Sequence, residues 1–462
     1  MMLLDIPDRN KKWLIFGSIF AAVLVVFVVW ACVLLTQENF YKGITVEEVN
    51  ISGLSKQQAR ALIDDALRNK YKDHAVTLQH KDKNWTVKLS DISYSFLTDK
   101  TLEKAYMLGR TGNVFQRLYN IADLMFNEVS FSCETDFDRE KLRSILSDIK
   151  KQVDRKEKDA SIIYQNGNIT LTNEIIGASL DVDTSLKMIE NQLLKRNFQN
   201  IVLKVEEKIP RVVYEDIKDL KHFIASFSTS FNAGDVNRSD NIRLASDRIN
   251  NTLLMPKDIF SMDKALGART IENGYKEAPV IYKNELVKGP GGGVCQVTTT
   301  LYGTVLRAKA KVLQRSPHSL PLGYVPLGQD ATIAEGAIDF KFQNNFDHPL
   351  LICSEVKGNK LTIKILGKRS TEDYIVKLKS VILEEYSPGK EEIIIDNNVP
   401  DGQMVVVQNA KRGFRVAVYR ETYSRNGELL DREKISEDVY RPQKAQIKVN
   451  ESYFSISPVM TE

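Results

Sequence analysis

Residues 288–310 read KGPGGGVCQVTTTLYGTVLRAKA, and this stretch contains the least ordinary combination of residues in the chain. Four glycines and a proline precede Cys295, so the backbone there can turn tightly and a substrate can approach it closely. After the cysteine, apolar residues recur at helical spacing: Val297, Leu301, Val305 and Ala308. This pattern predicts a helix over 296–310 with one buried stripe, and it places Cys295 at or just before the first helical turn.

A cysteine in that position has the setting of a nucleophile. Unpaired N–H groups and the positive end of the helix dipole stabilise a thiolate and lower the pKa of the thiol. Most solitary cysteines are instead small buried apolar residues. We interpret Cys353, in the strand-like run HPLLICSEV, and Cys133, in EVSFSCETDF, in that second way.

A cysteine nucleophile needs a base, and the pKa of histidine suits neutral pH. His318, in the Pro-rich segment QRSPHSLPLGYVP, is the best candidate. For a third group that orients the imidazole, Asp330 is the first choice and Asp339 the second. No HExxH, no paired Cys or His at ligand spacing, no P-loop and no GxGxxG pattern is present, so we expect neither a metal site nor a cofactor.

The composition is that of a globular protein. The chain has 462 residues, of which 43% are hydrophobic and 27% charged, and at about 150 residues per domain this suggests about three domains. The formal net charge is +4. That balance is too even for the basic surface that nucleic-acid binding requires, so no nucleic-acid partner is expected.

One segment near the N-terminus departs from this average. From Trp13 to Leu35 the sequence WLIFGSIFAAVLVVFVVWACVLL carries no charge, and about 20 apolar residues suffice to cross a bilayer. The run is longer than the apolar part of a cleaved signal peptide. Arg9, Lys11 and Lys12 precede it, which predicts a single-pass anchor in the cell membrane with residues 1–12 in the cytoplasm and the remainder extracellular, facing the cell wall.

The rest of the chain predicts an α+β multidomain protein. Residues 43–215 contain two similar units, each with a β-hairpin followed by a helix; Asn166-Gly167 is the expected turn of the second hairpin. Residues 222–367 form a second α+β domain, in which strands are expected near AKVLQR, AIDFKF and PLLICSEV. Residues 374–455 alternate apolar and polar side chains, which predicts a small β-rich module.

Residues 226–352 closely resemble the VanW family. The resemblance is carried by FSTSFNAGDVNRSDNIRLASDRINNTLLMPKDIFSMDKALGART, ENGYKEAPVI, GGGVCQVTTTLYGTVLRA and RSPHSLPLGYVPLGQDATIAEGAIDFKFQNN. Residues 43–210 look like the peptidoglycan-binding repeats that commonly precede VanW in membrane-anchored wall proteins. The tail, with NNVPDGQMVVVQNAKRGFRVAVYRETYSRNGE, is similar to the G-five type of wall-associated module.

Members of the VanW family with this layout include L,D-transpeptidases, so the resemblance implies an acyltransferase whose partners are peptidoglycan stem peptides. Cys295 would attack the carbonyl of residue three of a tetrapeptide stem and expel the terminal D-Ala; an amine of a neighbouring stem would then form a 3→3 cross-link. His318 would move the protons. Oxyanion or substrate contacts would come from Gly292, Gly293, Val294, Gln296, Thr298, Tyr302 and Arg315, with Arg269 as a further carboxylate clamp. For both arginines, a salt bridge inside the domain is the alternative.

Two other functions fit the same residues. The chain could be a non-catalytic wall-binding scaffold, because two of its three modules resemble adhesion devices. It could also be a cysteine peptidase of the same stems, which differs only in whether water or an amine resolves the acyl-enzyme.

Overall fold

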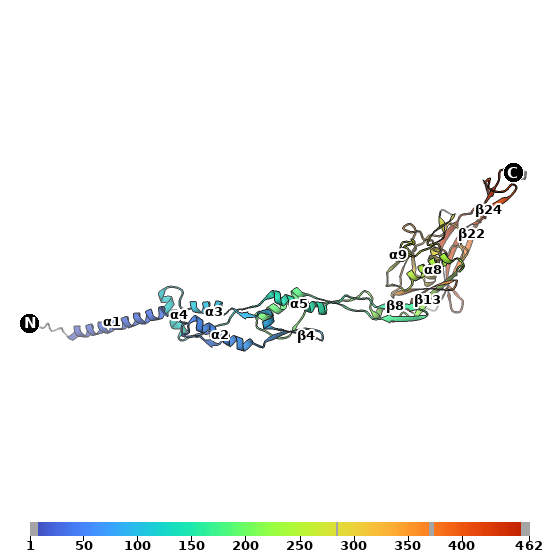
Figure 1. The fold of residues 1–462 in the computed structure, drawn as a ribbon. Helices are drawn as coiled ribbons and strands as arrows, with labels where there is room; N and C mark the ends of the chain where they lie inside the picture. Colours follow the sequence, from blue (N-terminus) through green and yellow to red (C-terminus); the bar gives the residue numbers. More distant parts are fainter. Residues whose placement is uncertain (1–7, 283–284, 369–373, 454–462) are drawn as a thin grey trace, which may run out of the picture. The chain divides into compact units, whose positions relative to one another are not determined.

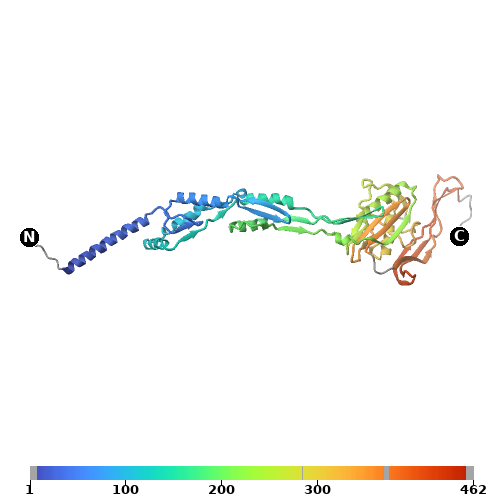
Figure 2. The same ribbon diagram turned by 90° about the horizontal axis from the view of Figure 1, so that it is seen from below.

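The computed structural model describes residues 8–282, 285–368 and 374–453, and the chain divides into two compact units. The first comprises Met1–Glu157 and Ile176–Ile209, and the second Lys158–Ile175 and Pro210–Glu462. Figures 1 and 2 show the elements of each unit from two sides. The expected module at 43–215 therefore contributes to both units rather than forming one compact body.

The first unit begins with helix α1, Asp8–Leu35 (Figure 1). Its segment Lys12–Leu35 contains an 18-residue window with a mean hydropathy of 2.9, and the segment is long and apolar enough to cross a membrane. The helix thus starts earlier than the uncharged run that predicted it. Of the expected cytoplasmic tail at 1–12, residues 1–7 lie outside the described part of the chain.

The remainder of the first unit is made of short strands and amphipathic helices. Its elements are β1 (Ile44–Val46), β2 (Val49–Asn50), α2 (Lys56–Tyr71), β3 (Ala75–His80), β4 (Lys83–Lys88), the 3₁₀ turn η1 (Leu89–Ile92), β5 (Ser95–Phe96), α3 (Thr98–Met107), α4 (Val114–Leu124), β6 (Val129–Phe131), β7 (Thr135–Asp136), α5 (Arg139–Val153), β10 (Gly177–Leu180), α6 (Val182–Leu194), β11 (Ile201–Val202) and β12 (Val205–Lys208).

These elements pack around two separate hydrophobic cores, and each of their sheets has at most three strands. In one, α5 and α6 bury apolar side chains such as Leu146 and Ile189 beside strands β3 and β4. In the other, α2 and α3 pack near β1 and β6, with Ile63 and Leu102 buried. The hairpin β3–β4 followed by helix α3 matches the sequence pattern of the first predicted unit.

The hairpin predicted around Asn166-Gly167 is present but belongs to the second unit. Strands β8 (Ser161–Gln165) and β9 (Asn168–Thr172) pair antiparallel, and both turn residues have positive φ, 50° and 91°. Ile162 shares an apolar cluster with Leu351 and Leu366 of the following domain. The local sequence therefore predicted the hairpin itself, but not its packing in the second unit.

The second unit is built on two antiparallel sheets and a buried helix. Its elements up to residue 367 are α7 (Tyr214–Ile217), β13 (His222–Ser230), α8 (Val236–Ile249), β14 (Thr252–Leu254), β15 (Ile259–Ser261), α9 (Met262–Leu266), β16 (Glu277–Tyr282), β17 (Glu285–Pro290), α10 (Val294–Ala308), β18 (Lys311–Gln314), β19 (Lys341–Gln343), β20 (Leu350–Lys357) and β21 (Lys360–Gly367).

One sheet has the strand order β13-β21-β20-β14, the other β15-β19-β18, and β16 pairs with β17 as a hairpin. The expected strands after the cysteine helix are therefore present, but β20 lies in a different sheet from β18 and β19.

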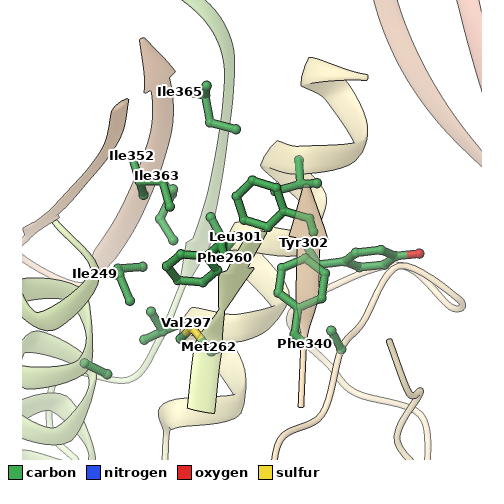
Figure 3. Close-up of a cluster of buried hydrophobic side chains, with 14 of the residues drawn as sticks. Ile249, Phe260, Met262, Val297, Leu301, Tyr302, Phe340, Ile352, Ile363 and Ile365 are labelled. Carbon is green, nitrogen blue, oxygen red and sulfur yellow. The ribbon is translucent and has the colours of Figure 1, made fainter. Parts of the chain in front are cut away.

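Helix α10 lies in the middle of this core. Figure 3 shows Val297, Leu301 and Tyr302 among side chains from the surrounding elements, including Phe260, Phe340 and Ile363. The helix is buried on nearly all sides rather than along one stripe, because its threonines satisfy their hydroxyls internally: Thr298, Thr300 and Thr304 each donate to the carbonyl four residues earlier. The spacing of apolar residues in the sequence does not reveal a helix face whose buried side chains are polar.

The C-terminal part of the second unit is all-β, as predicted. Strands β22 (Tyr374–Tyr386), β25 (Gly413–Ser424) and β26 (Leu429–Tyr440) form an antiparallel sheet, with β25 in the middle. A smaller sheet contains β23 (Glu392–Ile395), β27 (Gln446–Val449) and β24 (Met404–Gln408) (Figure 1). Gly427 has φ 86° in the loop between β25 and β26.

Candidate active site

The glycine-rich turn before Cys295 requires glycine at two adjacent positions. Gly293, the N-cap of α10, has φ 106°, in the region that side chains rarely adopt. A Cβ at Gly292 would lie 2.6 Å from the carbonyl oxygen of Pro279. The helix begins at Val294, two residues earlier than predicted, so Cys295 is its second residue.

The Cys295 thiol faces the loop that follows His318 in the sequence. Its Sγ lies 3.7 Å from Thr332 Oγ1 and 3.8 Å from the carbonyl oxygen of Ile333, and the residue is partly exposed. Burial raises the pKa of the Cys295 thiol, but the His318 imidazole, the Ile333 backbone and the Thr332 hydroxyl together outweigh burial, so the pKa lies below its usual value.

His318 is held by Asp330 through two hydrogen bonds to one carboxylate oxygen. Asp330 Oδ2 is 2.6 Å from His318 Nδ1 and also accepts the His318 backbone N–H at 2.7 Å. Burial lowers the pKa of His318, yet Asp330 and Cys295 outweigh it and raise that pKa to about 9. The His318 imidazole is therefore charged at neutral pH, and the Cys295 thiol ionises more readily than an ordinary cysteine; the thiolate is the form in which a cysteine attacks a carbonyl.

The second oxygen of Asp330 is bound from the C-terminal sheet. Tyr440, the last residue of β26, donates its hydroxyl to Asp330 Oδ1, and Arg315 Nη2 lies 3.4 Å from the same atom. Asp438, also on β26, accepts Arg315 Nη1 at 2.6 and 2.7 Å. All four side chains are almost fully buried.

Further bonds tie the backbone of the Asp330 loop to the same sheet. The Gly328 N–H donates to Tyr440 Oη at 2.7 Å, and Gln329 Nε2 donates to Ser380 Oγ of β22 at 3.1 Å. No candidate chemistry was predicted for this module, because a tyrosine and an aspartate on an alternating strand form no recognisable motif. Only the fold brings Tyr440 and Asp438 beside Asp330.

Other predicted contact residues are engaged inside the domain. The side chains of Val294, Thr298 and Tyr302 are buried, and Thr298 bonds back to the carbonyl of Val294. Gln296 donates to Thr229 Oγ1 and to the carbonyl of Ser230. These four side chains are thus fixed by the all-round burial of α10.

The backbone around Cys295 has fewer spare donors than expected. The N–H groups of Val294 and Gln296 donate to the carbonyls of Gly291 and Gly293 at 3.1 and 3.0 Å. Within the described part of the chain no acceptor is paired with the N–H of Cys295 itself. That group is the candidate oxyanion donor that the turn leaves open.

Both arginines proposed as carboxylate clamps form internal ion pairs, the alternative considered from the sequence. Arg315 pairs with Asp438 and Asp330, and Arg269 with Asp263 at 2.8 Å. The second-choice carboxylate, Asp339, accepts from Ser261 Oγ and from the Asp263 N–H. Asp339 therefore caps helix α9, and Asp330 is the carboxylate that contacts His318.

A cavity of about 700 Å³ lies between the Cys295 domain and the C-terminal sheet. Arg315, Pro317 and Tyr302 line one wall, and β26 residues such as Glu433 and Asp438 another. Cys295 and His318 are not among its lining residues.

Within the described ranges, no group of three or more His, Cys, Asp and Glu side chains is arranged to hold a metal ion.

Comparison with known families identifies the part of the chain that holds this site. The family model described as "VanW like protein" matches residues 237–366, which include Cys295, His318 and Asp330. Residues 237–366 are a VanW-like domain. The model described as "Putative peptidoglycan binding domain" matches residues 85–202, and that of the G5 domain matches residues 379–450. The chain thus contains the three kinds of module that its sequence resembles.

Two curated proteins are similar to this chain. The "Uncharacterized protein YoaR" of Bacillus subtilis is 41% identical over 142 residues, 31% of this chain and 47% of its own length. The "Vancomycin B-type resistance protein VanW" of Enterococcus faecalis is 28% identical over 172 residues, 36% of this chain and 62% of its own length. The chain thus spans about half to three fifths of the curated relatives it matches.

Among solved structures, one titled "IgA1 Protease G5 domain structure" covers 18% of this chain and 94% of its own, with 20% identity and a TM-score of 0.13.

The VanW-like domain ends before Ser380, Asp438 and Tyr440. The residues that complete the hydrogen-bond network around its Asp330 therefore lie in the region that matches G5.

Proposed function

We propose that this protein is a membrane-anchored L,D-transpeptidase that uses Cys295 to cross-link peptidoglycan stem peptides. The observation that carries the proposal is the grouping of Cys295, His318 and Asp330: Asp330 holds the imidazole at 2.6 Å, the pKa of the thiol is lowered, and that of the imidazole is raised to about 9. The match to a peptidoglycan-binding module supports peptidoglycan as the substrate class.

The proposed reaction has two half-reactions. The Cys295 thiolate attacks the carbonyl carbon of residue three of a tetrapeptide stem, and the oxyanion accepts a hydrogen bond from the N–H of Cys295. The His318 imidazolium donates its proton to the departing amine of D-Ala as the C–N bond breaks, which leaves a thioester. An amine of a second stem then attacks the thioester, His318 accepts its proton, and a new amide forms as the thiolate is released.

Helix α1 and the 1–12 segment give the proposed location. A single apolar helix with Arg9, Lys11 and Lys12 on its N-terminal side favours a cytoplasmic N-terminus, because positive charge is retained on the cytoplasmic side. The VanW-like domain would then face the cell wall, where its substrate is.

The deciding experiment is mass spectrometry of the full chain, in detergent, after incubation with purified tetrapeptide muropeptides. We expect an acyl adduct on Cys295, with release of D-Ala and formation of dimers. Trimmed monomers without dimers would indicate hydrolysis instead. Binding of muropeptides with no adduct and no product would indicate a wall-binding scaffold, and would refute the enzymatic proposal.

A further inference from the structure

The guanidinium groups near Cys295 differ in whether they have a negatively charged partner. Arg315 and Arg269, the clamps suggested by the sequence, are each neutralised by buried or partly buried carboxylates. Arg238, the third residue of α8, has no carboxylate within 4.0 Å among the described residues. It is partly buried, so its positive charge is incompletely solvated.

Arg238 is fixed beside the first turn of α10. Its Nη2 donates to Gln296 Oε1 at 2.7 Å, and its Cγ lies 3.0 Å from the place of a Cβ on Gly293. Gln296 is itself held at its other end by Thr229 Oγ1 and the Ser230 carbonyl. The amide of Gln296 therefore presents its oxygen to Arg238 and orients one edge of the guanidinium.

The same guanidinium and the Cys295 thiol both influence the Tyr324 phenol. Burial raises the pKa of the Tyr324 phenol; the Cys295 thiol raises it further, whereas Arg238 lowers it. One phenol thus lies within electrostatic reach of both the nucleophile and Arg238. A guanidinium has five N–H donors in a fork that fits a carboxylate, and one of them is used by Gln296.

We propose that Arg238 binds a carboxylate of the peptide that acylates Cys295, namely the free carboxylate one residue beyond the attacked carbonyl. The assignment rests on the proposed function for the identity of the peptide. Consecutive residues are about 3.8 Å apart, so this carboxylate stays close to the carbonyl carbon at Cys295. Arg238 contacts Gln296, the residue immediately after the nucleophile in helix α10.

The first test needs no peptide substrate. Iodoacetate and iodoacetamide alkylate the same thiolate and differ in one negative charge, so the ratio of their rates at Cys295 reports anion binding and cancels the thiolate fraction. In the full chain in detergent, we expect Arg238→Gln to lower this ratio about fivefold, the range of one charged hydrogen bond. Arg238→Lys keeps the charge and is expected to keep most of the ratio.

The matched control is Arg243→Gln on the same helix, whose guanidinium is exposed and pairs with Asp240. It is expected to leave the ratio as in the wild type. An unchanged ratio in Arg238→Gln, with the melting temperature of the control, overturns the proposal.

The second test uses tetrapeptide donors with a terminal carboxylate or a terminal carboxamide. The wild type should acylate faster with the acid, and Arg238→Gln should lose that preference about fivefold. Acylation with an equal preference in both proteins overturns the role of Arg238 and leaves the transpeptidase proposal standing. A normal change in the alkylation ratio with no acylation by any peptide supports the anion site and removes the proposed function.

Discussion

Cys295 and Cys353 lie in the same compact unit, and their surroundings give the two thiols opposite character. Cys353, on β20, is 1% exposed among apolar side chains, and burial raises its pKa to about 12. Cys295 also loses hydration, yet its pKa is lowered because the His318 imidazole lies beside it. The difference teaches that burial alone disfavours the thiolate, whereas burial beside a held imidazole lowers the pKa of the thiol.

The largest expected effect comes from replacing Cys295 and Cys353 by alanine in two separate variants. Cys295→Ala should abolish acylation, a loss of at least about 1,000-fold, since the remaining groups cannot form the thioester. Cys353→Ala should leave the rate within about twofold and cost about 1 kcal/mol of unfolding free energy through lost packing. Acylation rates and thermal melts of the two variants check this. Equal losses in both would break the comparison.

Removing the imidazole should make Cys295 resemble Cys353. His318→Ala takes away the positive charge and the proton carrier, so alkylation of Cys295 by iodoacetamide at neutral pH should fall about 100-fold. The control is His348→Ala, whose ring nitrogen lies 3.0 Å from the Pro349 carbonyl and plays no part in the site. Unchanged alkylation in His318→Ala, measured by peptide mapping, would remove His318 from the mechanism.

The carboxylate that holds the imidazole is expected to matter less than the imidazole. Asp330→Asn keeps a hydrogen-bond acceptor and loses the charge, so the pKa of His318 should fall and Cys295 alkylation should drop about tenfold. Asp339→Asn, which affects only the cap of α9, should leave alkylation unchanged. The reverse result would exchange the roles of the two aspartates.

The pH dependence follows from the raised pKa of His318. That pKa is about 9 in the folded protein against an ordinary 6.5, so the stabilisation from charged His318 is fully present below 6.5 and is lost as pH rises through 9. Acylation needs the imidazolium proton, and its rate should fall about tenfold per pH unit above 9. A rate profile in the absence of acceptor amine tests this; a plateau beyond pH 10 would contradict it.

The smallest effect on Cys295 is expected from a substitution in the C-terminal sheet. Tyr440→Phe removes a hydroxyl that donates to Asp330 and accepts the Gly328 N–H, and the loss of about one hydrogen bond corresponds to about a fivefold slower alkylation of Cys295. The downfield resonance of the His318 Nδ1 proton should move as well. In Tyr423→Phe, whose hydroxyl bonds Glu421, both readouts should stay as in the wild type.

The sequence by itself determined the apolar helix, the helix after Cys295, the hairpins and the β-rich tail, since each is a local pattern of periodicity, glycine or turn residues. It also gave Cys295, His318 and Asp330, because a glycine-rich helix start and a Pro-rich loop are visible in the order of residues. The burial of α10 on all sides was not predictable, since its threonine hydroxyls are satisfied by bonds that no apolar count records.

Only the tertiary structure decided which charges remain available. Arg315, Arg269 and Arg238 are alike in sequence, yet Arg315 and Arg269 pair with carboxylates, whereas Arg238 contacts Gln296 and has no carboxylate partner among the described residues. Likewise Tyr440 and Asp438 act on the VanW-like domain although they belong to another module. Ion pairs and hydrogen bonds of this kind depend on distances between segments far apart in the chain, and these are set by packing rather than by local sequence.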